Sequence, residues 1–265
     1  SSPKYPGDHT FTPYDPELKV DIYYPLGHDS SSDMASLAYP VFLYYHGGGW
    51  RYGDRKRDVP LCTVNYLLAR GVAFVSADYR VLQHGFNGSH ILEDAFGVVD
   101  WLHEKGLELN LDMNRSVASG NSAGGHLAMM VGYAMPPKSV SGVVTLWGVE
   151  PGFSGGENGT KPSSSSSSSR ASFHADDPAM RRFYSPANHV DATSPPTLLI
   201  HGLGDTAVDI AQSRYVAERL REHNVTHQLV GVPGQNHACD IEPFGPCFRA
   251  QALTLQHFLQ YVFTL

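Results

Sequence analysis

The sequence predicts an α/β fold in which helices cover both faces of a mostly parallel central sheet. Short apolar segments bounded by turn residues alternate with longer segments of helical periodicity along most of the chain. The short segments are apolar on both faces, as are strands of a parallel sheet covered on each side. The βαβα order also predicts right-handed crossovers between neighbouring parallel strands.

The individual elements follow from these patterns. The segment "KVDIYYP" at 19–25 alternates polar and apolar residues and is typical of a half-buried antiparallel strand. Parallel strands are expected in "PVFLYYH", "GVAFVSADYR", "SVASG", "SGVVTLWG" and "PTLLIHG". Helical spacing predicts helices over 89–105, 123–135, 209–223 and about 247–263. A further short helix is expected in "PAMRRFYSPA".

Length and composition favour one domain over residues 1–265, because the chain is 42% hydrophobic and can bury a sizeable core. A polar insertion or cap is expected around 151–185. Its first part, 151–177, contains seven consecutive serines and almost no apolar residue, so it cannot pack a core. We expect a mobile surface segment there, either a lid over a site or a disordered linker.

The net charge of −7 argues against nucleic acid or an anionic membrane as a partner, since no basic stripe is present. No apolar run approaches the roughly 18 residues of a spanning helix, and no signal peptide core precedes residue 12. These observations favour a cytoplasmic location. Secretion is the alternative, weakly supported by sequons at Asn87, Asn114, Asn158 and Asn224.

The three cysteines are too few for a disulfide scaffold. Cys239 and Cys247 are close enough in sequence to pair locally, which leaves Cys62 over. The sequence does not decide whether that pair forms.

Three consecutive glycines in "HGGGW", at 46–50, follow a buried strand directly. Such a run marks a sharp turn or a close approach of the backbone to a ligand. A plain turn is one interpretation. The other is that the N–H groups of Gly48 and Gly49 bind the oxygen of a reacting carbonyl, while His46 holds the loop by hydrogen bonds. Trp50 either contacts substrate or belongs to the core.

The segment "GNSAG" at 120–124 fits Gly-x-Ser-x-Gly and lies between a predicted strand and a predicted helix. In that arrangement Ser122 occupies a strained turn, and a Cβ on either flanking glycine would collide with a neighbouring element. Ser122 is thus the candidate nucleophile, and the N–H of Ala123 is a further candidate donor to the oxyanion.

A serine nucleophile needs a base and an acid. His237 is the candidate base among fourteen histidines, because it follows a predicted strand and a glycine-containing loop near the C-terminus. Asp205 is the candidate acid because it follows the end of the 196–202 strand, and Asp209 is its rival. His201 and His257 are interpreted as structural.

Together these segments resemble the α/β-hydrolase fold, and in particular hormone-sensitive-lipase-like carboxylesterases and the related kynurenine formamidase group. The resemblance rests on "HGGGW", "ADYR", Glu93-Asp94, "GNSAG", "HGLGD" and "GQNH", in family order from about 38 to 240. It implies hydrolysis of short-chain or aryl esters, or of N-formylkynurenine, without a metal or organic cofactor. The segment "VLQHGFNGSH" after Arg80 departs from the lipase-like pattern.

Three functions therefore stand as hypotheses. The first is a serine hydrolase that acts on a carboxylic ester of a small or aromatic substrate. The second is an amide hydrolase of the arylformamidase type, and the third is a ligand receptor without catalytic activity. The receptor ranks last, because Ser122, Asp205 and His237 are all present. The oligomeric state is open.

Overall fold

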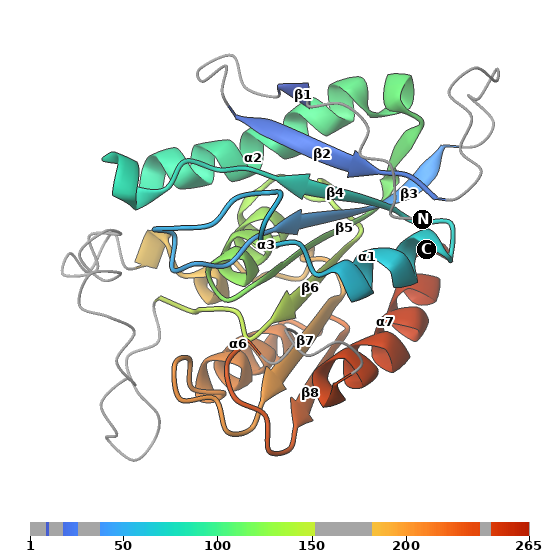
Figure 1. The fold of residues 1–265 in the computed structure, drawn as a ribbon. Helices are drawn as coiled ribbons and strands as arrows, with labels where there is room; N and C mark the ends of the chain where they lie inside the picture. Colours follow the sequence, from blue (N-terminus) through green and yellow to red (C-terminus); the bar gives the residue numbers. More distant parts are fainter. Residues whose placement is uncertain (1–8, 11–17, 26–37, 152–181, 239–244, 265) are drawn as a thin grey trace.

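The computed structural model describes residues 9–10, 18–25, 38–151, 182–238 and 245–264. Eight strands of this part form one sheet in the order β1-β2-β4-β3-β5-β6-β7-β8 (Figure 1). The strands are β1 (His9–Thr10), β2 (Lys19–Tyr23), β3 (Tyr39–Tyr45), β4 (Ala73–Ala77), β5 (Leu111–Asn121), β6 (Gly142–Leu146), β7 (Thr197–Gly202) and β8 (His227–Val232). β2 pairs antiparallel with β1 and β4, and the other neighbours are parallel. The predicted mostly parallel sheet is confirmed.

The predicted long helices are all present, with ends that differ by a few residues at most. The helices are α1 (Leu61–Leu68), α2 (Gly88–Lys105), α3 (Ala123–Ala134), α6 (Ala211–Glu222) and α7 (Pro246–Thr264), and the 3-10 turns are η1 (Leu82–His84), η2 (Gly106–Leu109) and η3 (Pro186–Asn188). Helix α1 was not predicted, because it has only eight residues, too few to show a clear helical period. Residues 152–181, and with them nearly all of the predicted insertion and half of the expected short helix, lie outside the described residues.

Alternating side chains of the strands divide the core into two layers. On β3, Val41, Leu43 and Tyr45 pack with residues of α2, α3 and α6. Phe42 and Tyr44 point to the other face, where α1 and α7 cover the sheet. Figure 1 shows α1 and α7 together on one side of the sheet. This is the two-sided burial that the apolar strand segments predicted.

The segment after β4 is anchored to α2 by a buried ion pair. The guanidinium of Arg80 donates to both carboxylate oxygens of Asp94, and the Arg80 backbone N–H also donates to Asp94 Oδ2 at 2.8 Å. Asp94 is only 2% exposed. Burial raises the pKa of Asp94, while its bonds to Arg80 act in the opposite direction. The "ADYR" and Glu93-Asp94 motifs of the sequence therefore meet in space.

Replacing Arg80 with methionine leaves the Asp94 carboxylate buried without its cation. We expect the free energy of unfolding to fall by about 3 kcal/mol, the usual cost of breaking a buried ion pair from one side. In the double variant Arg80→Met/Asp94→Leu most of this loss is recovered, because no buried charge is left. Urea denaturation followed by circular dichroism measures both. A loss below about 1 kcal/mol in Arg80→Met shows that the pair does not anchor this segment.

Candidate active site

Ser122 lies in a sharp turn between β5 and α3, with a φ of 52° and a ψ of −117°. This backbone conformation is strained for a residue with a side chain. Close packing on both sides imposes it. A Cβ on Gly124 would lie 1.9 Å from the carbonyl oxygen of Tyr45 on β3, and one on Gly120 would lie 2.4 Å from the backbone of Gly124. The predicted collisions at both flanking glycines are thus confirmed.

Ser122, His237 and Asp205 form one continuous line of hydrogen bonds. The Oγ of Ser122 lies 3.0 Å from Nε2 of His237, and Nδ1 of His237 lies 2.8 Å from Oδ2 of Asp205. A carboxylate only accepts, so Nδ1 carries the hydrogen and Nε2 is left to accept from the serine hydroxyl. The three sequence-predicted residues come together from the ends of β5, β7 and β8.

The carboxylate of Asp205 is ionised and held on both oxygens. Its Oδ1 accepts the N–H groups of Ala207 at 2.9 Å and Val208 at 2.8 Å. Burial alone would raise the pKa of Asp205, but hydrogen bonds from His201, His237 and the Val208 N–H outweigh it and hold the pKa well below its usual range. The side chain is therefore negatively charged near neutral pH.

Asp209, the rival acid, has a different role in the structure. Its Oδ1 accepts the N–H of Ala211 at 2.9 Å, at the beginning of α6. Aspartate at this position satisfies a helix N–H group that has no intrahelical acceptor. Among the described residues, Asp205 and not Asp209 is the carboxylate bonded to His237.

The oxyanion donors predicted from the sequence are backbone N–H groups of the glycine loop and of the residue after Ser122. Gly48 and Gly49 have φ values of 108° and 62°, and a Cβ on Gly48 would lie 2.2 Å from the carbonyl oxygen of Tyr52. Ala123 is the first residue of α3, where N–H groups have no acceptor within the helix. Within the described part of the chain, no hydrogen bond occupies the N–H of Gly48, Gly49 or Ala123. Such groups suit a negatively charged oxygen.

His46 supports this glycine loop through contacts with Gly47 and Tyr79. Its Nδ1–H donates to the carbonyl of Gly47 at 2.8 Å, and its ring stacks on Tyr79 at 4.2 Å. The hydroxyl of Tyr79 donates to the carbonyl of His46 at 2.8 Å. Burial lowers the pKa of His46, so the ring is neutral. The predicted supporting role of His46 agrees with these contacts.

Trp50 belongs to the core. It is 3% exposed and its indole lies edge to face against the ring of His126, with centroids 5.3 Å apart. It is not among the residues that line the described cavity beside the site. Of the two alternatives for Trp50, substrate contact and core, its burial favours the core.

Asn236 is a residue of the site that the sequence analysis passed over. Its Oδ1 accepts the N–H of Thr206 at 2.9 Å and the N–H of His237 at 2.7 Å. One side chain thus joins the loop that carries Asp205 to the loop that carries His237. The signal available in the sequence was its position next to the candidate base, which is weak on its own.

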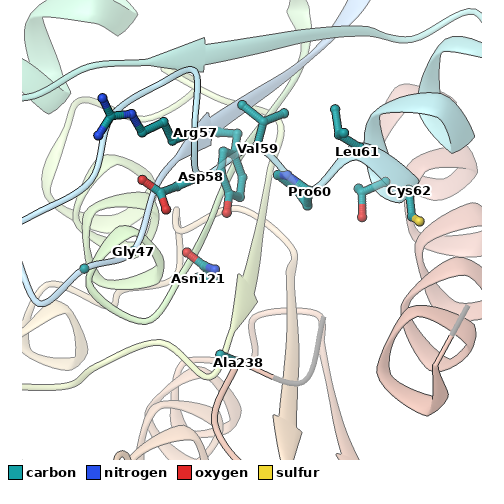
Figure 2. A pocket seen from close by; sticks show the side chains of 12 residues that line it. Gly47, Arg57, Asp58, Val59, Pro60, Leu61, Cys62, Asn121 and Ala238 are labelled. Carbon is teal, nitrogen blue, oxygen red and sulfur yellow. The ribbon is translucent and has the colours of Figure 1, made fainter. Parts of the chain in front are cut away.

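A cavity of about 450 Å³ adjoins the glycine loop and the turn at Ser122 (Figure 2). Gly47, Gly48 and Asn121 form one side of it, and Ala238, next to His237, also lines it. Residues 57–63 line it as well and include the polar Asp58 and the apolar Val59, Pro60 and Leu61. Figure 2 shows the Asn121 side chain between Gly47 and Ala238.

Other sequence expectations have mixed outcomes. Cys247 is disulfide-bonded and Cys62 is a free thiol. Cys239, the possible local partner that the sequence left open, lies outside the described residues. No group of three or more metal-ligating side chains occurs among the described residues. None of the helices in this part is long and apolar enough to span a membrane. The sequons at Asn87, Asn114 and Asn224 are exposed, and Asn158 is not described.

Several curated relatives of the chain are named esterases, and others are fungal non-reducing polyketide synthases of which the match covers 5%. Esterase LipC of Mycobacterium tuberculosis is 28% identical over 271 residues, covering 91% of this chain and 62% of LipC. Carboxylesterase NlhH of the same species is 29% identical over 126 residues, covering 44% of this chain and 38% of NlhH. The chain therefore spans less than two thirds of the length of the curated relatives it matches.

Comparison with solved structures supports the same fold. Esterase 2 of Thermogutta terrifontis with butyrate bound gives a TM-score of 0.79 at 22% identity, over 97% of this chain and 94% of that one. The same esterase phosphonylated by sarin gives a TM-score of 0.81. The sequence model of the BD-FAE family matches residues 20–220. The predicted resemblance to α/β-hydrolase serine esterases is confirmed, and the chain belongs to the BD-FAE family.

Proposed function

We propose that the protein is a serine hydrolase that cleaves a carboxylic ester of a small or aromatic substrate through an acyl-enzyme intermediate. The observation that carries the proposal is the hydrogen-bonded line from Ser122 through His237 to Asp205. The N–H groups of Gly48, Gly49 and Ala123, which have no acceptor among the described residues, support it. A serine hydroxyl bonded to a neutral imidazole, whose other nitrogen is bonded to a carboxylate, is an activated nucleophile. The esterase relatives support the same reaction class.

The steps follow from the positions of these groups. Ser122 Oγ attacks the ester carbonyl carbon while its proton passes to Nε2 of His237, and Asp205 stabilises the imidazolium that forms. The negative charge that develops on the carbonyl oxygen is met by the N–H groups of Gly48, Gly49 and Ala123. Collapse of the tetrahedral intermediate expels the alcohol, which takes the proton from Nε2. Water then attacks the acyl-enzyme by the same route, releasing the acid and restoring Ser122.

The cavity in Figure 2 favours a substrate of limited size. Its volume of about 450 Å³ lies toward the lower end of the range of ligand pockets. Asp58 and Asn121 interrupt its apolar wall. Burying a long alkyl chain against such polar groups removes them from water without replacing their hydrogen bonds. A short acyl chain or an aromatic group fits the mixed wall better.

An arylformamidase-type amide hydrolase, acting on N-formylkynurenine, is the second candidate. The same nucleophile, base and donors serve acyl transfer from an amide, and the sequence motifs resemble that group as well. A receptor without catalytic activity is the weakest candidate, because such a protein has no need for the geometry that joins Ser122 to His237.

A panel of p-nitrophenyl esters of increasing acyl length, with N-formylkynurenine beside it, tests the function. We expect kcat/KM to be highest for acetate to butyrate or for aromatic acyl groups, and lower by about tenfold or more for palmitate. Ser122→Ala is the matched control and abolishes turnover of every ester above the buffer rate. Activity that rises steadily up to palmitate contradicts the proposed substrate class, and activity that survives in Ser122→Ala contradicts the mechanism.

Asparagine substitutions separate Asp205 from Asp209. Asp205→Asn keeps the shape of the side chain but allows the wrong tautomer of His237. We therefore expect kcat to fall by about 10⁴, the loss that this substitution causes in serine proteases. In Asp209→Asn the helix cap is retained, because asparagine caps about as well as aspartate, and turnover should stay within about an order of magnitude. Circular dichroism checks that both variants fold. The reverse pattern assigns the acid to Asp209, and equal mild losses place it at neither residue.

A further inference from the structure

A second histidine contacts the carboxylate of Asp205. His201 lies near the end of β7 and is fully buried. Its Nε2 lies 2.9 Å from the carbonyl oxygen of Val208 and 3.3 Å from Oδ2 of Asp205. Its Nδ1 lies 2.7 Å from the hydroxyl of Ser213 on α6. The side chain is therefore enclosed by polar partners on both ring nitrogens.

These partners determine the tautomer of His201. The carbonyl of Val208 and the carboxylate of Asp205 can only accept, so Nε2 must carry the hydrogen and share it between them. In the neutral ring Nδ1 is then an acceptor, and the hydroxyl of Ser213 donates to it. Within the described residues this is the one hydrogen bond of the Ser213 side chain. The acceptors at Nε2 therefore set the His201 tautomer, and the Ser213 hydroxyl completes the hydrogen bonding of the ring by donating to Nδ1.

The same oxygen of Asp205 also accepts from His237. Oδ2 is hydrogen-bonded to His237 at 2.8 Å and lies 3.3 Å from Nε2 of His201, whose N–H is shared with the Val208 carbonyl and helps to lower the pKa of Asp205, while Oδ1 accepts two backbone N–H groups. Four donors restrict how the carboxylate can rotate. They also spread its negative charge over more than one partner, which weakens its pull on any single one.

We propose that Ser213 and His201 are positioning residues that extend the line from Ser122 through His237 to Asp205. This inference rests on the proposed function. Ser213 donates to Nδ1 of His201 and so makes the Nε2–H a stronger donor, and His201 restrains the Asp205 carboxylate and weakens its attraction for the proton on His237. Neither Ser213 nor His201 contacts the reacting atoms. No proton leaves His201 during the reaction.

A purely architectural role is the alternative, in which His201 and Ser213 only join the end of β7 to α6. Both roles predict a loss of stability on substitution, so stability does not separate them. The pH dependence of kcat/KM does. Among the described residues, the titratable side chains that contact the Asp205 carboxylate are His201 and His237. Asp209 is instead hydrogen-bonded to the beginning of α6.

The test compares His201→Met, which removes the N–H, with His201→Gln, whose Nε2 can still donate to Asp205. We expect His201→Met to lower kcat about tenfold and to move the acidic limb of the kcat/KM profile up by roughly 0.5–1 pH unit. The limb moves to higher pH because the Asp205 carboxylate, with one donor fewer, holds the proton on His237 more strongly. His201→Gln should keep the limb in place. Ser213→Ala should move it in the same direction by a smaller amount, and it serves as the test if His201→Met does not fold.

An unshifted limb in both His201→Met and Ser213→Ala overturns the proposal, as does an equal shift in His201→Gln and His201→Met. A readout independent of turnover is ¹⁵N NMR of histidine-labelled protein, with the His201 signals assigned from their loss in His201→Gln. We expect hydrogen on Nε2 and none on Nδ1, both in the unmodified protein and in Ser213→Ala, because the acceptors at Nε2 remain in place. Hydrogen on Nδ1 in the unmodified protein overturns the proposal. Failure of the proposed function would appear separately, as absence of turnover in the unmodified protein.

Discussion

The strained turn at Ser122 is the constraint on which the arrangement of the site depends. Its φ of 52° is imposed where α3 begins immediately after β5, with Gly124 packed against the carbonyl oxygen of Tyr45 on the neighbouring strand. That close approach places Ser122 above the carboxyl edge of the sheet. The ends of β3, β7 and β8 meet at the same edge and bring the glycine loop, Asp205 and His237 within reach. The sheet thus holds four separate chain segments at one point.

The polar groups around this point are supported from outside the reacting line. Tyr79 and His46 fix the glycine loop from one side, and Asn236 ties together the loops that carry Asp205 and His237. Hydrogen bonds from several elements converge on Asp205. Such support has a physical purpose, because groups that must stabilise charge act best when they need not reorganise during the reaction.

Short-range patterns in the sequence were sufficient to locate the main groups. "GNSAG" is self-contained, since its glycines, serine and flanking elements are all local, and the collisions expected at Gly120 and Gly124 are present. The order along the chain was enough to choose His237 from fourteen histidines. Asp205 was separated from Asp209 by its distance from the end of a strand, which the parallel sheet makes meaningful.

What the sequence could not supply are contacts between distant segments. His201 was interpreted as structural, because nothing near it in the chain indicates that Ser213 lies against its ring. The burial of Trp50 depends on His126 of α3, and the cavity wall from 57 to 63 depends on where α1 packs. These features arise from tertiary packing, which local periodicity in the sequence does not predict.

We propose that Ser122 forms a covalent bond to the substrate while the N–H groups of Gly48, Gly49 and Ala123 bind the charged oxygen. A crystal structure of the protein after reaction with an organophosphate such as paraoxon tests it most directly. The account predicts phosphorus on Ser122 Oγ, with the phosphoryl oxygen within about 3 Å of those N–H groups. An adduct on another residue, or a phosphoryl oxygen turned away from the glycine loop, would contradict it.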